Sequence, residues 1–259
     1  MLPACTNSIW TAVERYEADK LDNGADFETD VTYGVFGADI ALTPAMRVGL
    51  ALQVSQSDLK SPNYGLKNDM DAFGLTVYGS MALADATKLV GEFAWTKSGN
   101  DITSSLRDLE NDIDADVMSL AVRAQTTFTS DPVTLVPSAG VRVSRLTTDG
   151  FNVGGIRLAD EDQTLVQLPL SLTVTTQPIE ASGWQWMPYG KVTFAPTFGD
   201  NELDVLGYKQ TVIDKLPVQG DFGAVFRKSA FEWKGTLSTG FGHDGTKSFG
   251  GKLGMSLSF

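Results

Sequence analysis

The last eight residues, Lys252–Phe259, constrain the fold more than any other segment of the sequence. Apolar residues alternate there with polar or small ones: Leu253, Met255, Leu257 and Phe259 against Lys252, Gly254, Ser256 and Ser258. This period of two places the apolar side chains on one face of an extended strand. A chain that ends on an aromatic residue of such a strand is unusual for a water-soluble protein. The pattern is typical of a transmembrane β-barrel, in which one strand face meets lipid and the other meets water.

The same alternation recurs along the chain in segments separated by turn residues. Several segments are long enough for a tilted membrane strand, and longer than most strands of soluble sheets. The sequence therefore predicts an all-β fold, a transmembrane antiparallel up-and-down β-barrel of about twelve strands. The predicted strands are Ile9–Ala18, Phe27–Leu42, Ala45–Ser57, Asp69–Ala82, Thr87–Lys97, Asp114–Phe128, Val133–Arg145, Gln163–Thr175, Trp184–Phe194, Gly220–Arg227, Phe231–Phe241 and Thr246–Phe259.

The connections between these strands alternate between short and long. The short ones are Thr43-Pro44, Leu83–Ala86, Thr129–Pro132, Gln177–Gly183 and Lys228–Ala230, and the long polar ones are Asp58–Asn68, Ser98–Ile113, Leu146–Asp162 and Gly199–Gln219. Bacterial outer-membrane barrels have short periplasmic turns and longer outer loops. We therefore expect both termini on the periplasmic side. Because proline removes a ladder hydrogen bond, we expect bulges at Pro137, Pro169 and Pro188.

Composition narrows the remaining possibilities. The chain of 259 residues has a formal net charge of -12, which argues against binding to nucleic acid. It contains no apolar run long enough for a membrane-spanning helix, and its lone Cys5 excludes a disulfide within the chain. The basic and apolar regions of a signal peptide are missing, so we expect Met1 not to be the natural start. Residues 1–8 are predicted to be a linker remnant and residues 9–259 a barrel domain that is a monomer.

Charged residues fall mainly on the polar faces and in the predicted loops. The loop acids include Asp19, Asp22, Asp26, Asp101, Asp108, Glu110, Asp112, Asp114, Asp160, Glu161 and Asp162. The charges predicted to face the lumen are Asp39, Arg47, Glu92, Arg123, Arg142, Lys191, Glu232, Lys234 and Lys252. Cations outnumber carboxylates in this second set. Two interpretations stay open, since these charges either pair and hydrate in a wide interior or tune what passes through it.

Ordered motifs give the chain a family resemblance. They are Tyr33–Leu42, Val48–Asp58, Phe73–Ser80, Pro137–Ser144 and Gly250–Phe259. Together they resemble the C-terminal translocator domain of a classical autotransporter, the type V secretion system. The resemblance implies an outer-membrane barrel of twelve strands that anchors and helps export an N-terminal passenger domain, which this chain lacks. It also implies recognition by the barrel-assembly machinery through a terminal signal, here Lys252, Gly254, Leu257 and Phe259.

The resemblance has one departure. Family members carry a helix that threads the pore before the first strand, and Met1–Ser8 is too short for that helix. We therefore expect an open lumen that prefers anions. Whether the passenger is released by self-cleavage stays open, as does a native helix before residue 1.

No enzymatic chemistry is predicted. The only histidine, His243, lies in a predicted turn with Asp244 and Gly245, and lacks the geometry of a catalytic triad. The acidic segment Asp108–Asp116 lacks the glycine and glutamate spacing of a calcium loop, so we expect neither a metal nor a cofactor. Loop acids could instead bind divalent ions that bridge lipopolysaccharide, the expected lipid partner.

Two alternative functions remain, a porin without a passenger and a soluble β-sandwich binding module. The tryptophans have two interpretations as well, membrane-interface girdles or core packing. These residues are Trp10, Trp95, Trp184, Trp186 and Trp233.

Overall fold

The computed structural model describes residues 7–22, 25–105, 109–150, 152–153, 156–157, 160–199, 202–205, 208–211, 215–243 and 245–259. Residues 1–6 of the predicted linker, and the acids Asp108 and Asp244, lie outside these ranges. No helix in the described ranges is long and apolar enough to cross a membrane.

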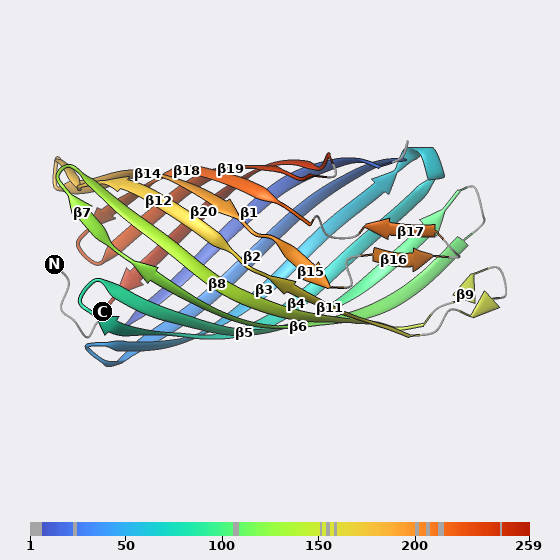
Figure 1. The fold of residues 1–259 in the computed structure, drawn as a ribbon, viewed down its shortest axis with the longest axis horizontal. Coiled ribbons are helices and arrows are strands. Elements are labelled where there is room, and N and C mark those ends of the chain that lie inside the picture. Colours follow the sequence, from blue (N-terminus) through green and yellow to red (C-terminus); the bar gives the residue numbers. More distant parts are fainter. Residues whose placement is uncertain are drawn as a thin grey trace.

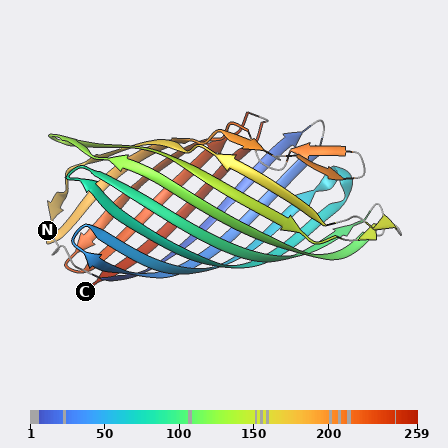
Figure 2. The same cartoon turned by 60° about the horizontal axis from the view of Figure 1, so that its bottom comes forward.

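Nearly the whole described chain is β-structure, arranged as a barrel of tilted strands (Figures 1 and 2). The ring consists of β1 (Ser8–Asp22), β2 (Ala25–Thr43), β3 (Met46–Ser61), β4 (Leu66–Ala84), β5 (Thr87–Ser104), β6 (Leu109–Thr126), β8 (Val133–Thr148), β12 (Leu170–Thr176), β14 (Trp184–Phe194), β18 (Val218–Lys228), β19 (Phe231–Phe241) and β20 (Lys247–Ser258). Each strand pairs antiparallel with the next, and β12 pairs with β8 to complete the sheet. In the described residues this is the predicted closed barrel of twelve strands.

Shorter elements extend the ring strands or lie in their connections. They are η1 (Pro62–Tyr64), β7 (Phe128–Ser130), β9 (Asn152–Val153), β10 (Ile156–Arg157), β11 (Glu161–Gln167), β13 (Ile179–Ala181), β15 (Thr197–Gly199), β16 (Glu202–Val205) and β17 (Tyr208–Thr211). The hairpins β9–β10 and β16–β17 lie at the end of the barrel opposite the termini (Figure 1).

The two ends of the chain meet at one end of the barrel. The first and last strands pair along twelve residue positions, from Ser8 opposite Ser258 to Asp19 opposite Lys247. Asn7 and Phe259 continue this ladder, because each donates its backbone N–H to the other's carbonyl oxygen at 2.9 Å. The short turns at residues 44–45, 85–86, 131–132, 182–183 and 229–230 lie at this same end. We call it the turn end and the opposite one the loop end.

An apolar band covers the outside of the barrel. Large hydrophobic side chains occupy alternate positions and are exposed, for example Phe36 at 55% and Leu120 at 58%. Buried hydrophobic residues are few and include Ala12 and Ala51. A soluble sandwich would bury these side chains instead, because exposed apolar area costs free energy in water. The exposed band is the surface that a lipid bilayer covers.

The strand lengths predicted from the sequence are too short at the loop end. The predicted loop Ser98–Ile113 is mostly strand, since β5 continues to Ser104 and β6 begins at Leu109. Most of the acids assigned to loops, including Asp101, Asp112 and Asp114, therefore lie in strands. The apolar alternation ends there because the strands extend beyond the apolar band, where polar outward side chains are favourable.

The internal prolines lie where a neighbouring ladder is interrupted. Pro137 lies opposite the break between β6 and β7, and Pro188 opposite the break between β12 and β13. Pro169 separates β11 from β12, and its carbonyl oxygen accepts the Gly140 N–H at 3.0 Å. Each missing N–H thus falls at a position that forms no regular ladder bond.

Candidate functional site

The polar strand faces line the inside of the barrel. Hydrogen bonds join side chains on strands that are not neighbours, and only the concave side of a barrel brings such side chains together. Trp10 on β1 donates its Nε1–H to the Tyr78 hydroxyl on β4 at 2.7 Å. Gln53 on β3 donates to the Thr96 hydroxyl on β5 at 3.0 Å. The lumen is therefore bridged by polar side chains as well as lined by them.

Near the turn end these bridges form a network centred on Asp39. Its Oδ2 accepts hydrogen bonds from the hydroxyls of Ser8 at 2.8 Å and Tyr78 at 3.4 Å. Its Oδ1 accepts the Nε–H of Arg47 at 2.9 Å. Together with Trp10 the network joins strands β1, β2, β3 and β4. The carboxylate is thus held in place by hydrogen bonds from three other residues.

Two glycines let the aromatic members of this network lie against the wall. A Cβ at Gly37 would lie 2.4 Å from ring atoms of Trp10, and one at Gly49 would lie 2.2 Å from the Tyr78 ring. Such distances are far below van der Waals contact, so the rings lie over bare backbone. Trp10 therefore faces the lumen and is not part of a girdle facing lipid.

Most carboxylates that face the lumen form an ion pair with a cation on a different strand. Arg142 Nη2 lies 2.9 Å from Glu92 Oε1, and Lys252 Nζ lies 3.1 Å from Glu14 Oε2. The other pairs are Arg47–Asp39, Lys191–Asp221 and Arg227–Glu232. Lys252 also donates to the Tyr33 hydroxyl at 2.8 Å, so it connects β20 to β1 and β2 across the seam between the first and last strands.

Three lumen cations have no carboxylate partner among the described residues: Lys88, Arg123 and Lys234. The Lys234 ammonium lies 4.8 Å from the centre of the Tyr189 ring, where the π-electrons attract it. Arg123 and the paired Arg142 and Lys191 line a hollow of about 210 Å³ in the inner wall. Two further carboxylates, Glu161 and Glu180, lie near the two ends of the lumen. The middle of the lumen thus carries more cations than carboxylates.

Sequence reasoning missed several members of this lining. Glu14 lies in the weakly patterned first segment, whereas Lys88, Asp221 and Arg227 follow the same alternation as the predicted set. Following the alternation to the ends of β5 and β18 would have found those three. The cross-strand partners themselves need the barrel, because they are far apart in sequence.

The residues of the proposed terminal signal lie on both faces of β20. Lys252 and Gly254 are at lumen-facing positions and pair with Glu14 and Ala12 of β1. Leu257 is at an outward-facing position and pairs with Ile9. Phe259 is 67% exposed at the turn end. The four residues therefore form no common side-chain cluster, and what they share is their place on the last strand, which pairs with β1.

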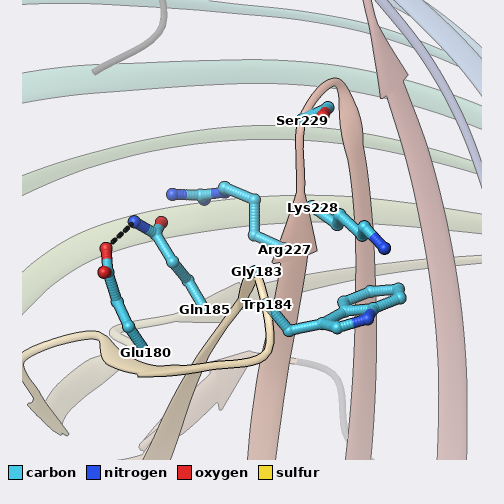
Figure 3. A pocket seen from close by; sticks show the side chains of 7 residues that line it. All are labelled: Glu180, Gly183, Trp184, Gln185, Arg227, Lys228 and Ser229. Carbon is cyan, nitrogen blue, oxygen red and sulfur yellow. Dashed lines mark hydrogen bonds between the residues drawn. The ribbon is translucent and has the colours of Figure 1, made fainter.

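A second hollow, of about 520 Å³, lies at the turn end between β13–β14 and β18–β19 (Figure 3). Gln185 donates its side-chain N–H to Glu180 at 2.9 Å. On the other side, the Lys228 ammonium lies 5.3 Å from the centre of the Trp184 ring. Figure 3 shows Arg227 and Gln185 extending away from the side of Trp184 and Lys228. Trp184 and Lys228 are on the outer face, where such an amphipathic pair suits a membrane interface.

Neither catalysis nor metal binding gains support from this geometry. His243 lies in the turn between β19 and β20, where the Gly242 N–H bonds the Thr246 carbonyl oxygen at 2.8 Å. Within the described ranges, no group of three or more His, Cys, Asp or Glu residues could hold a metal ion. What the lumen offers is a wall of polar and charged side chains.

Comparisons with known proteins agree with this architecture. The pattern of the family described as Autotransporter beta-domain matches residues 9–251. The translocator domain of the autotransporter NalP from Neisseria meningitidis superposes with a TM-score of 0.80 at 14% identity, covering 98% of this chain and 88% of that one. The beta domain of the Bordetella autotransporter BrkA gives 0.80 at 13%, covering 98% and 99%. The transport unit of AIDA-I from Escherichia coli gives 0.77 at 13%, covering 97% and 90%. No curated protein matches the sequence.

Proposed function

Because the chain belongs to the autotransporter β-domain family, we propose that it anchors and helps export a passenger domain joined to its N-terminus. As a member of the family it is an outer-membrane translocator domain, and passenger export is the family's role. The observation that carries the proposal is the closed barrel with an exposed apolar band and a polar, charged lumen.

The proposal includes an orientation. The turn end, with Asn7 and Phe259, faces the periplasm, and the loop end faces the cell exterior. The short turns and longer opposite connections support this, since outer-membrane barrels are built that way. A passenger that precedes β1 then starts on the periplasmic side and has to cross the membrane to reach the surface.

The proposed partners are the barrel-assembly machinery and the lipids of the outer membrane. The machinery would recognise β20 through Lys252, Gly254, Leu257 and Phe259. In the folded barrel β20 is already paired with β19 and β1, so recognition would take place before the sheet closes. The terminal Phe259 stays exposed even after the sheet has closed.

The lumen charges have a proposed role in selectivity. Lys88, Arg123 and Lys234 leave a positive excess on the lumen wall, and fixed charge raises the local concentration of counter-ions. We expect small anions to carry more current than small cations. This expectation concerns small ions. If a polypeptide passes through the lumen, the same cations would attract its acidic segments.

A display experiment tests the export proposal. The chain is produced behind a signal peptide, with an epitope-tagged flexible segment fused before Met1. We expect antibody to bind the tag on intact cells, and external protease to remove it. Heat-modifiable migration in a detergent gel reports separately whether the barrel has folded.

The outcomes separate the candidate functions. A folded barrel whose tag is reached only after the outer membrane is permeabilised would contradict export and favour a passenger-free channel. A chain that stays monodisperse in buffer without detergent would contradict the membrane barrel. A variant that lacks Phe259 should lose most of its folded, surface-displayed fraction, and near-normal display of that variant would contradict the assembly role.

A further inference from the structure

A groove crosses the outside of the barrel where the apolar band ends toward the loop end. Its volume is about 600 Å³, and it is carried by neighbouring strands β2, β3, β4 and β5. Its lining includes Gly34, Val54, Gln56, Phe73, Trp95 and Lys97. All six are outward-facing positions of their strands. The groove therefore opens to the surrounding membrane and not to the lumen.

The floor of the groove is apolar and held in place. Val54 is 60% and Phe73 is 45% exposed. The rings of Phe73 and Trp95 meet edge to face, with centroids 6.5 Å apart. Trp95 also donates its Nε1–H to Asp116 Oδ1 at 3.0 Å, which fixes the indole over the floor. Gly34 has no side chain to fill the space beside Val54, so the hollow exists before any ligand arrives.

The groove leads directly into a row of carboxylates on the same strands. Cross-strand pairs connect Asp30 to Asp58, Asp58 to Asp69, Asp69 to Asp101 and Asp101 to Asp112. The row thus crosses β2 to β6, and adjacent strands lie about 4.8 Å apart, so it extends over roughly 19 Å. Like charges directly opposite one another are unfavourable in a sheet.

The cations near this row neutralise it only in part. Lys67 pairs with Asp69, Arg15 pairs with Asp30, and Lys97 Nζ lies 2.9 Å from Asp114 Oδ2. Asp58, Asp101 and Asp112 are in no ion pair among the described residues. Asp71, which lines the groove, has none there either. Asp58 and Asp69 share a hydrogen bond across their strands, as do Asp101 and Asp112. The described cations, Lys60 among them, balance the remaining negative charge of the row only in part.

We propose that the groove and the carboxylate row together bind a phosphorylated glycolipid of the outer leaflet through divalent cations. An acyl chain lies on the floor over Gly34, Phe73 and Trp95. The headgroup phosphates lie beside the row, and the cations bridge phosphate oxygens to carboxylates, since Mg²⁺ and Ca²⁺ prefer oxygen ligands. The inference deepens the proposed function, because it rests on the loop end facing outward.

The shape and charge of the surface favour this occupant over a phospholipid. An acyl chain alone would explain the floor but not the row beside it. A headgroup with a single phosphate reaches only a small part of a row that crosses five strands. A broad headgroup with several phosphates can cover the width of the carboxylate row, and its bound divalent cations complement the negative charge of the row. Lys97, at the junction of groove and row, supplies one direct partner for a phosphate.

The test measures binding of purified lipopolysaccharide to the folded full chain in detergent micelles with Mg²⁺. Tryptophan fluorescence and native mass spectrometry report bound glycolipid per barrel. Gly34→Leu fills the groove, and its Cβ would lie 3.8 Å from Val54 Cγ2, an ordinary contact. Loss of contact with two methylene groups should weaken binding by roughly tenfold. Gly235→Leu is the matched control, because a Cβ there meets nothing within 4 Å, and β20 and β1 separate β19 from the groove.

Further arms identify the headgroup. We expect EDTA, or the double variant Asp58→Asn with Asp101→Asn, to reduce glycolipid binding, and phosphatidylglycerol not to replace it. Equal binding by Gly34→Leu and wild type would overturn the proposal, as would binding that is indifferent to EDTA or equal for phosphatidylglycerol. Heat-modifiability is measured for every variant, so a failure to fold is distinguished from a loss of lipid binding. Surface display of the tagged chain reports a failure of export separately.

Discussion

The two faces of the barrel wall carry opposite charge, although they alternate residue by residue along the same strands. Inside, pairs such as Arg142–Glu92 neutralise most carboxylates, and Lys88, Arg123 and Lys234 remain as excess cations. Outside, beyond the apolar band, carboxylates dominate and several of them have no cation partner in the described residues. The charges on the lumen face nearly cancel and leave a small positive excess, whereas the outer face beyond the apolar band is strongly negative.

The difference follows from what surrounds each face. Charges in the lumen are held among side chains from across the barrel, so an unmatched charge there has fewer ways to be neutralised. Charges on the outer face between the apolar band and the loop end meet solvent, salt and lipid headgroups, which screen or bind them. Because the period is two, a shift of register by one residue would exchange the faces. Substitutions on the two faces should therefore have separate effects, and this can be tested at adjacent residues.

The largest effect is expected where a charge is placed on the lipid face. Leu120 on β6 faces outward in the apolar band, and Ala121 faces the lumen opposite Glu92. Leu120→Arg should destabilise the barrel by about 2–4 kcal/mol, the cost of a cation in the middle of the bilayer. Ala121→Arg should change stability far less, because its side chain enters the polar lumen beside Glu92, where it competes with Arg142 for that carboxylate.

Reversible urea unfolding in lipid vesicles, followed by tryptophan fluorescence, measures both variants. Leu120→Lys serves as a second outward charge, and Leu120→Met as a control that keeps the face apolar. Equal destabilisation by Leu120→Arg and Ala121→Arg would show that the two faces are not distinguished in this part of β6.

A smaller effect is expected on ion selectivity, with no change in folding. Planar bilayers under a salt gradient should give a reversal potential of the anion-selective sign. The triple variant Lys88→Gln, Arg123→Gln and Lys234→Gln removes the unpaired cations and should bring this potential close to zero. The double variant Arg142→Gln with Glu92→Gln removes a neutral ion pair and should leave it nearly unchanged. A cation-selective wild-type pore would contradict the lumen assignment.

The sequence predicts the barrel well and its ends poorly, for one physical reason. Alternation between apolar and polar residues exists only where one face meets lipid. The segment around Leu120 is therefore evident, whereas the continuation of β5 to Ser104 is not. Beyond the apolar band the strands are held together by backbone hydrogen bonds, which any residue except proline can donate.

The lining of the lumen shows a similar limit. Period two places Arg142 and Glu92 on the inner face, but their pairing joins strands β8 and β5 with β6 between them. That contact depends on the curvature of the closed sheet. Trp10 illustrates the same point, since only the barrel brings it to Tyr78 and removes it from the lipid face.

The smallest expected effect concerns protonation on the outer face. The hydrogen bond with Asp69, followed by loss of hydration and the charge of Asp69, raises the pKa of Asp58, while Lys60 and Lys67 oppose the rise. At Asp162 the hydrogen bonds from Arg145 and Thr147 lower the pKa. The Asp58 carboxyl therefore favours folding most below its unfolded pKa of about 3.9, and this contribution is lost as pH rises through its higher folded pKa. Asp162 behaves oppositely: its contribution is present above about 3.9 and is lost as pH falls through its lower folded pKa.

Carbon-13 NMR of the side-chain carboxyls in micelles can follow both titrations in one sample. We expect Asp58 to titrate at higher pH than Asp162. Asp69→Asn should lower the Asp58 midpoint, because the neighbouring negative charge is gone and the new amide can donate a hydrogen bond to the ionised form. The Asp162 midpoint should not move in that variant, since its partners lie on β8. If Asp58 titrates at or below Asp162 in the wild type, the carboxylates of the outer row do not interact as their cross-strand pairing requires, and the repulsion that would draw divalent cations to this surface is absent.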